Sequence, residues 1–203
     1  MTQASSHRYS KGIARRQEII NTAMQTFSTV GYNKSSMMHI ASEVGLTRAG
    51  LAHYFPSKES LLTAVLDWRD AENEKLFLSQ DSSEDDPLAF FHGLLTLTAH
   101  NATVPGLIGL YTILSAEASD PEHPAHDYFV NRYRRTVGMM RAHLESAQRA
   151  GYVRSDVDVF DIAIRITAMM DGLQTQWLLS NGNISMEGHL RPLLQEVLNV
   201  HLD

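Results

Sequence analysis

The residues from Thr47 to Gly50 combine hydrogen-bonding capacity with small size. A helix that reads base edges in the major groove of duplex DNA needs small or hydrogen-bonding side chains at its exposed N-terminal half, because bulky ones would hold it out of the groove. Arg48 carries the guanidinium fork that suits guanine, and Gly50 would let the backbone approach DNA closely. The run therefore predicts a recognition helix, although Gly50 could instead relieve a contact between two helices.

Side chains suited to phosphate flank this run on both sides. Ser35 and Ser36 stand at the expected N-terminus of one short helix, and Lys58 stands at the start of another, where the helix dipole also attracts anions. Tyr54 offers a hydroxyl for a phosphate oxygen, and His53 could face a base or the backbone. The predicted DNA-contacting residues are Ser35, Ser36, Thr47, Arg48, Ala49, Gly50, His53, Tyr54 and Lys58.

Two short helices, Ser36 to Val44 and Thr47 to about Tyr54, are expected to position these groups. Ile40 and Ala41 fall on the inward face of the first helix, and Ala41 is small enough for a close crossing. Gly45 can take the positive φ of a tight turn, and Thr47 is placed to cap the second helix. The segment predicts a helix-turn-helix.

The remaining chain also has helical periodicity, and no window alternates as a strand would. The predicted fold is all-α with about nine helices: an N-terminal three-helix helix-turn-helix domain over residues 1–56 and a larger helical ligand-binding and dimerisation domain over residues 57–203. The first long helix is expected from about Lys11 to Thr29, with Gly31 as its stop signal. An acidic, serine-rich break from Gln80 to Asp86 precedes a helix expected to start at Asp86-Pro87.

The charge is distributed unevenly along the chain. The formal net charge is -6, yet residues 1–58 hold seven basic and two acidic side chains, which leaves the remainder at -11. This asymmetry favours a basic head for a phosphate backbone and an acidic body that stays off it. There is no cysteine and no long apolar run, so the expectation is a cytoplasmic protein without disulfide, membrane span or cofactor.

The segment from Arg15 through Leu66 resembles the TetR family of one-component bacterial regulators. The resemblance rests on Phe27, Gly31 and Tyr32, on IAxxxGLT at Ile40 to Thr47, and above all on HYFPSKExLL at His53 to Leu62. It implies a homodimer whose two heads bind a palindromic double-stranded operator, with repression that is relieved by a small-molecule effector. Carried over by position, the family's DNA contacts fall on the nine residues named above.

The body offers candidates for an effector pocket and a dimer interface. Apolar and polar side chains that could line a pocket are Tyr111, Arg132, Met140, Asp171, Gln174 and Trp177, although residues at helical spacing more often belong to a core. The resemblance implies that the last two helices form the dimer interface, through Leu173, Trp177, Leu190, Leu194, Val197 and Leu198. An intramolecular core would show the same periodicity.

Two other functions compete with a regulator. Glu117, His123, His126 and Asp127 could form a metal site of a small hydrolase, but acids and histidines also cap helices at such proline-broken corners, and the frames of known zinc, nucleophile or phosphate sites are missing. A helical adaptor that has kept the head and lost DNA binding is the third possibility. The regulator is the function that the sequence favours, and no metal is expected.

Overall fold

A computed structural model describes residues 3–78, 86–104 and 106–202, and within these ranges every regular element is a helix. The nine helices confirm the all-α prediction. They are α1 (Gln3–Lys34), α2 (Met37–Glu43), α3 (Arg48–Tyr54), α4 (Lys58–Leu78), α5 (Ala89–Thr103), α6 (Leu107–Glu117), α7 (His126–Arg149), α8 (Val159–Leu179) and α9 (Met186–Leu198).

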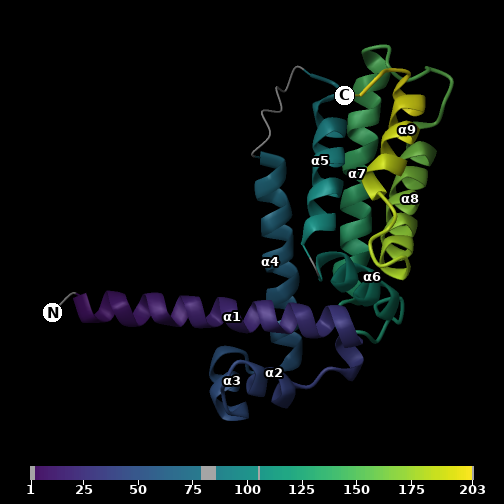
Figure 1. Cartoon of the computed structure of the whole chain (residues 1–203). Helices are drawn as coiled ribbons and strands as arrows, with labels where there is room; N and C mark the ends of the chain where they lie inside the picture. The colour runs from purple at the N-terminus through teal and green to yellow at the C-terminus, as the bar shows by residue number, and fades with distance from the viewer. Residues whose placement is uncertain (1–2, 79–85, 105, 203) are drawn as a thin grey trace.

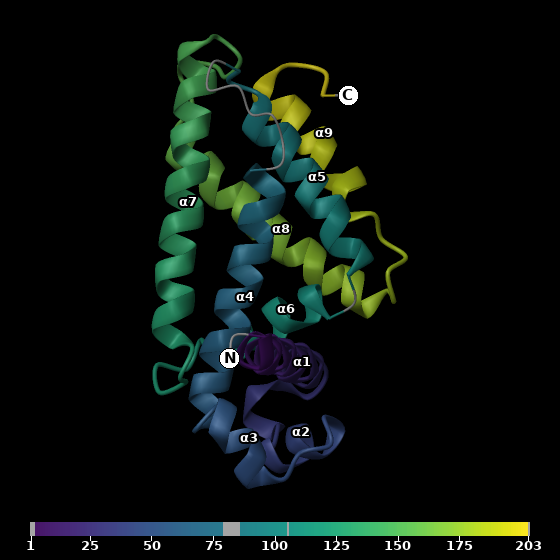
Figure 2. The same ribbon diagram turned by 90° about the vertical axis from the view of Figure 1, so that its left-hand side faces the viewer.

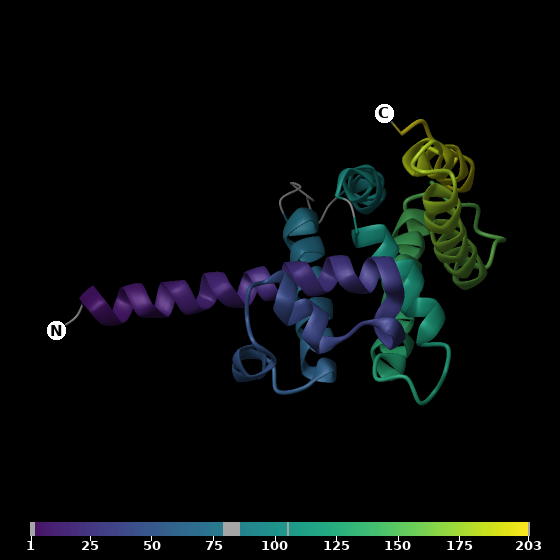
Figure 3. The same cartoon turned by 60° about the horizontal axis from the view of Figure 1, so that its bottom comes forward.

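The helices form a small head below a taller body. In Figure 1, α1 runs across the base of the body, α2 and α3 lie on its far side, and α4 leads upward from the head alongside the body helices. In Figure 2, α7 stands upright, α5, α8 and α9 slope across the body, and α6 lies at the junction with the head. The N-terminal part of α1 projects well beyond the other helices (Figure 3).

Two groups of buried side chains hold these parts together. The first joins the head to α4 and α6, with Phe27, Ile40 and Leu51 packed against Leu61 and Leu114. The second group fills the body. Its members include Phe91, Met140 and Leu144, together with a row of leucines on α9: Leu190, Leu194 and Leu198. α4 and α6 contribute to the head's core and also reach the body. Because packed cores transmit displacements, a movement of either helix would shift the head residues packed against it.

The crossing of α1 and α6 depends on Gly109. A Cβ at this position would lie 2.9 Å from the backbone oxygen of Ser28, so a larger residue would separate the two helices. Just beyond the crossing, Gly31 turns the chain with φ of 80°, as its expected role as a stop signal requires. The Glu117 carboxylate then accepts hydrogen bonds from the backbone N–H groups of Tyr32 (2.7 Å) and Asn33 (3.4 Å).

The predicted N-cap Thr47 is confirmed, and two predicted helix starts are displaced. Ser36, Thr47 and Asp158 each accept a hydrogen bond from a backbone N–H of the following helix. α1 begins at Gln3, earlier than Lys11, because apolar periodicity marks only the part of a helix that packs against something. α5 begins at Ala89, with Asp86 accepting from the N–H of Leu88, while the predicted break before it lies largely outside the described residues.

Candidate nucleic-acid interface and body cavity

The turn between α2 and α3 has the geometry that its sequence predicts. Gly45 adopts φ of +62°, and Ile40 and Leu51 are fully buried on either side of the turn. The Thr47 hydroxyl oxygen accepts a hydrogen bond from the N–H of Gly50 at 3.0 Å, which satisfies one of the unpaired donors of the first turn of α3. The buried face of α3 is thus anchored and its orientation on the head is determined.

The opposite face of α3 is directed outward. Thr47, Arg48, Ala49 and His53 are exposed, while Gly50 and Tyr54 are half-buried. A Cβ on Gly50 would have its nearest neighbours in Thr47 and Leu46, at 3.3 to 3.7 Å, so the close contact at this glycine is with its own turn. The His53 and Tyr54 rings meet edge to face, with centroids 5.7 Å apart. The outward surface is therefore slim at its N-terminal end and aromatic at its C-terminal end.

Two of the predicted phosphate contacts are already bonded within the chain. Ser35 is buried, and its hydroxyl donates to the backbone oxygen of Tyr32 at 2.6 Å. The Nζ of Lys58 lies 4.2 Å from the Tyr32 ring centroid and donates to the backbone oxygen of Asn33 at 3.4 Å, and burial lowers the pKa of Lys58. Ser36 is exposed at the N-terminus of α2. In this conformation Ser36 and the outward face of α3 are the accessible part of the predicted set.

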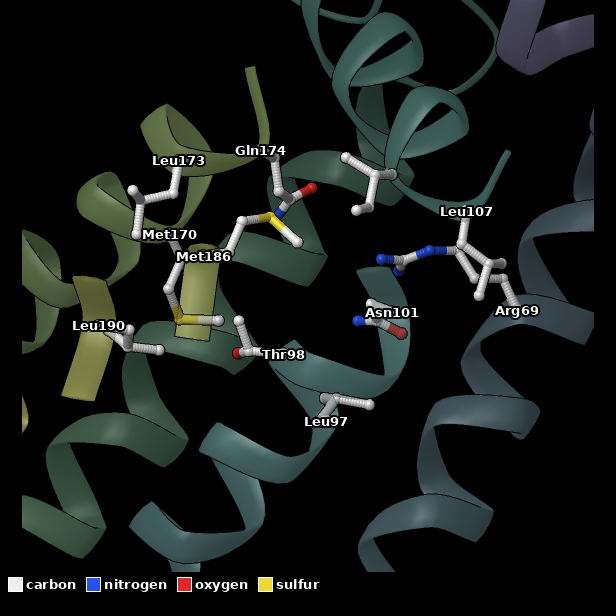
Figure 4. Close-up of a pocket in the computed structure, with 11 residues that line it drawn as sticks. Arg69, Leu97, Thr98, Asn101, Leu107, Met170, Leu173, Gln174, Met186 and Leu190 are labelled. Carbon is white, nitrogen blue, oxygen red and sulfur yellow. The ribbon is translucent and has the colours of Figure 1, made fainter. Parts of the chain in front are cut away.

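The body contains a cavity between α4, α5, α6, α8 and α9. Its empty space, including the open mouth, is about 450 Å³. Most of the wall is apolar, with Leu107 and Ile108 from α6, Met170 from α8 and Met186 from α9. The polar groups are Arg69, Thr98, Asn101 and Gln174. Figure 4 shows the Arg69 guanidinium extending from α4 into this space, opposite the residues of α8 and α9.

Arg69 is the most unusual of the lining residues. It is only 6% exposed, and no described residue accepts a hydrogen bond from its Nε or Nη1. Burial lowers the pKa of its guanidinium to about 10, so it remains protonated near neutral pH. Asn101 also has a buried side-chain oxygen without a partner among the described residues. Both groups face a space in which a ligand could satisfy them.

A cluster centred on Asp70 lies behind Arg69. The Asp70 carboxylate accepts hydrogen bonds from Arg132 (2.7 Å) and from the Tyr128 hydroxyl (2.9 Å). The Arg69 and Arg132 guanidinium carbons lie 4.7 Å and 5.0 Å from the Tyr111 ring centroid. The cluster joins the middle of α4 to the first turns of α7, next to Arg69 at the cavity.

The predicted effector residues divide into three groups. Gln174 lines the cavity. Tyr111, Arg132 and Asp171 belong to the polar surroundings behind it, and the Asp171 carboxylate accepts from the Tyr133 hydroxyl at 2.8 Å. Met140 is a core residue, and Trp177 packs at the edge of the same core.

Of the residues that line the cavity, only Gln174 was among the predicted effector residues, and the most informative of those missed are Arg69 and Asn101. Arg69 follows Leu62 and Val65 on the buried face of α4, and Asn101 follows Leu94 at the same helical spacing on α5. A polar residue at a position where the apolar periodicity predicts burial was the available signal in both cases.

The predicted dimer residues lie mostly inside the single chain. Leu190, Leu194 and Leu198 are fully buried in the body core, and Leu173 and Leu190 line the cavity. Side chains without exposed surface cannot contact a partner in this conformation. Trp177 and Val197 are half-buried. The resemblance implies a partner for the apolar row of α9, and helical periodicity does not show what covers that face; here the protomer's own core covers its leucines.

The histidine side chains of the acid and histidine cluster at the proline-broken corner between α6 and α7 bond within that corner. His123 Nδ1 accepts from the N–H of Ala125 at 3.1 Å, and His126 Nδ1 lies 2.8 Å from the backbone oxygen of Ala118. His123 is buried, which lowers its pKa, and its Nε2 is 3.8 Å from Glu117. Across the ranges that the structure describes, no group of three or more acid or histidine side chains could hold a metal ion.

A helix-turn-helix head whose second helix is capped and faces outward, joined to a helical body with a cavity, defines the class of DNA-binding transcriptional regulators. Residues 19–65 match the family model described as bacterial regulatory proteins of the tetR family. Residues 116–201 match the model described as BetI-type transcriptional repressor, C-terminal. The two matches together cover more than half of the chain, which belongs to the TetR family. None of the described helices is long and apolar enough to cross a membrane.

Individual relatives agree with this assignment. The regulator YdgC of Bacillus subtilis strain 168 is 23% identical over 84% of this chain and 85% of its own length. RutR of Escherichia coli K12 is 40% identical, but over only 26% of this chain and 25% of its own length. A TetR regulator structure from Chloroflexus aurantiacus has a TM-score of 0.79 at 20% identity and covers 95% of this chain and 98% of its own. A protein of Saccharomonospora viridis solved in complex with choline has a TM-score of 0.75 at 24% identity, covering 89% and 95%.

Proposed function

We propose that the protein is a homodimeric repressor that binds a palindromic operator through α3 of each protomer and is released when a small molecule occupies the body cavity. The observation that carries this proposal is the outward face of α3, where Arg48 is exposed beside the small residues Thr47, Ala49 and Gly50. Because a two-fold axis relates the two heads, the half-sites should lie about one helical turn of DNA apart or at a longer spacing of the same logic. Since the partner is chromosomal DNA, the proposed site of action is the cytoplasm.

The cavity is connected to the head by two helices. Arg69 is one wall residue, and it lies on α4, which begins at Lys58 directly after the helix-turn-helix. Leu107 and Ile108 line the cavity from the start of α6, whose last residue is Glu117, the acceptor of the Tyr32 and Asn33 N–H groups. An effector that binds one arrangement of these helices better than another shifts the population of head positions. That the similar Saccharomonospora viridis protein was solved with choline supports a small-molecule site in such bodies.

A gel-shift assay with DNA from upstream of the protein's own gene tests the operator. We expect a specific shift that Arg48→Ala and Tyr54→Phe each weaken. A shift that neither substitution changes would mean that α3 is not the reading helix. Absence of any shift, with folded dimeric protein, would favour the adaptor over the regulator.

The release mechanism is tested by the distance between the two heads. The chain has no cysteine, so Ser42→Cys, at an exposed position on α2, gives one spin label per protomer. Double electron–electron resonance on the labelled dimer should give a distance between the two labels that changes when an effector is added. An unchanged distance, under conditions in which the effector releases DNA, would rule out movement of the heads as the mechanism.

A further inference from the structure

The body cavity is lined by a buried positive charge, the Arg69 guanidinium. Arg69 is nine-tenths buried, its Nε and Nη1 have no acceptor among the described residues, and its guanidinium extends into the cavity (Figure 4). A guanidinium removed from water is strongly disfavoured unless acceptors surround it. The cavity is therefore complementary to a group that brings a negative charge and hydrogen-bond acceptors.

The nearest carboxylates of the protein are already bonded elsewhere. The distance from Arg69 Nη1 to Asp70 Oδ1 is 3.8 Å, which is beyond hydrogen-bond range, and this oxygen accepts from Arg132 and Tyr128. Asp171 accepts from Tyr133, and burial raises its pKa. Neither group accepts a hydrogen bond from Arg69, and no other described residue accepts one from its Nε or Nη1, which leaves these two donors open to a ligand.

We infer that the effector is a compact monocarboxylate with an apolar body, whose carboxylate binds the Arg69 guanidinium and whose apolar part packs against Leu107, Met170 and Met186. This inference rests on the proposed function of the cavity as the effector site. Asn101 lines the same cavity, and its side-chain amide N–H can donate to the carboxylate as the second polar contact, whereas its amide oxygen, which only accepts, cannot. The mostly apolar wall explains why the rest of the ligand is hydrophobic.

Other classes of ligand fit these walls less well. Quaternary ammonium ligands such as choline are held by aromatic faces, and none of the described residues that line the cavity is aromatic. The charge of Arg69 also repels a cation. A phosphate dianion needs more than one free guanidinium, but the second arginine nearby, Arg132, is bonded to Asp70 and does not line the cavity.

The experiment measures ligand-induced thermal stabilisation and calorimetric affinity of the full-length protein. The probes are straight-chain carboxylates from acetate to decanoate together with benzoate. Benzamide and octan-1-ol serve as neutral probes, choline as a cation and phenyl phosphate as a dianion. We expect carboxylates of intermediate size to raise Tm by about 4 °C or more at a hundredfold excess over their Kd. The neutral, cationic and phosphate probes should leave Tm unchanged.

The matched variants are Arg69→Met and Arg135→Met. Arg135 also approaches Asp70, at 3.7 Å, but its side chain is 68% exposed and does not line the cavity. Arg69→Met should weaken carboxylate binding by about ten- to a hundredfold, because a charge-assisted contact is lost, whereas Arg135→Met should leave it unchanged. Arg69→Met should change the Tm of the unliganded protein little, because it removes a buried charge whose Nε and Nη1 have no hydrogen-bond acceptor among the described residues.

Several results would overturn the inference. They are an absence of carboxylate binding, equal binding of benzoate and benzamide, stronger binding of choline or phenyl phosphate, or equal losses in the two arginine variants. If Arg69→Met does not fold, two other measurements test the inference. They are the affinities of the wild-type protein for the charged and neutral probes, and the carboxylate affinity of Asn101→Leu, which should fall several-fold. Specific DNA binding without any carboxylate effect would contradict this inference alone. Carboxylate binding that depends on Arg69, in a protein that binds no DNA, would contradict the proposed repressor function alone.

Discussion

At the scale of single residues, the outward face of α3 offers one guanidinium among small side chains. Arg48 is exposed, and its neighbours Thr47 and Ala49 leave room for a DNA groove to approach. Arg15 and Arg16, by contrast, are engaged within the head: Arg15 donates to the backbone oxygen of Val44, and the Arg16 guanidinium carbon lies 4.8 Å from the Phe55 ring centroid. The basic charge of the head is thus partly structural, and Arg48 is the residue on which base reading is proposed to depend.

Arg48→Ala should weaken operator binding by about ten- to a hundredfold, because one guanine contact contributes about 1–3 kcal/mol of discrimination. Titration of labelled operator in a fluorescence anisotropy assay measures the change. Arg149→Ala, at an exposed position on α7, is the matched control and should bind as the wild type does. Equal affinities of the Arg48 variant for operator and for unrelated DNA would agree with a specific contact, whereas unchanged operator affinity would contradict it.

Asp70→Asn should lower the stability of the whole protein. The carboxylate that accepts from Arg132 and Tyr128 would become neutral, leaving the nearby guanidinium groups without a counter-charge. Since the Asp70 side chain is 30% exposed, we expect a loss of about 2 kcal/mol and a fall in Tm of about 4–8 °C. Thermal unfolding measures it, with Asp67→Asn, exposed on the same helix, as the control. An equal Tm for both variants would show that the cluster does not stabilise the fold.

At the scale of helices, α6 connects the cavity to the head. Its first residues line the cavity, Gly109 lets it cross α1 closely, and Glu117 at its last turn accepts the N–H groups that follow Gly31. A Cβ on Gly31 would lie only 2.4 Å from the Glu117 carboxylate, so the glycine is needed for the contact as well as for the turn. A displacement of α6 along α1 would therefore be transmitted to the chain leading into α2.

Glu117→Gln should loosen this connection. The charge-assisted hydrogen bonds to Tyr32 and Asn33 would become neutral ones, and a loss of about 1.4 kcal/mol corresponds to about tenfold faster amide exchange. Hydrogen-exchange NMR at the Tyr32 and Asn33 amides measures the change. Glu122→Gln, at an exposed position of the neighbouring corner, should leave both rates as they are. Protection that survives Glu117→Gln would mean that backbone packing alone holds the end of α1.

At the scale of the whole molecule, the exposed apolar side chains of α8 indicate where a second protomer would bind. Phe160, Ile164 and Leu179 are 47%, 45% and 80% exposed, although each is large and apolar. On α9 the leucine row is buried in the protomer's own core, whereas Val197 is half-buried and keeps some exposed surface. Exposed apolar patches of this kind are typical of association surfaces. The proposed interface therefore uses the outer faces of α8 and α9, and not the buried row.

The double substitution Phe160→Asp with Ile164→Asp should produce a monomer. The free energy needed to desolvate two carboxylates in an apolar interface should exceed the free energy gained by association. Light scattering after size-exclusion chromatography measures the mass, and operator affinity should fall with it because one head alone lacks the second half-site. Val130→Asp, at a 41% exposed position on α7, is the control for adding charge elsewhere. A double variant that stays dimeric would place the interface on another surface.

The head could be predicted from sequence almost entirely because its determinants are local. Gly45 has to turn, Thr47 has to cap, and Ile40 and Leu51 have to be buried, and each of these needs depends on neighbours a few residues away. The partial exceptions are Ser35 and Lys58. Their position in the sequence predicts a hydroxyl and a charge that are accessible to phosphate, whereas in the structure both groups are bonded within the chain. Their partners, Tyr32 and Asn33, are set by the turn after Gly31, and position in the sequence does not reveal where a side chain points.

The sequence by itself determined the helical fold, the helix-turn-helix and the family, because helix periodicity, caps and turn glycines act over short distances along the chain. The tertiary structure alone decided that Arg69 lines a cavity with Asn101, its Nε and Nη1 without acceptors among the described residues, and that Leu190, Leu194 and Leu198 fill the protomer's core. Periodicity shows which face of a helix is covered, but the neighbour that covers it is set by packing between segments far apart in the sequence. For the same reason, an arginine in an apolar stripe signals a buried charge, and only the assembled helices show which groups surround it.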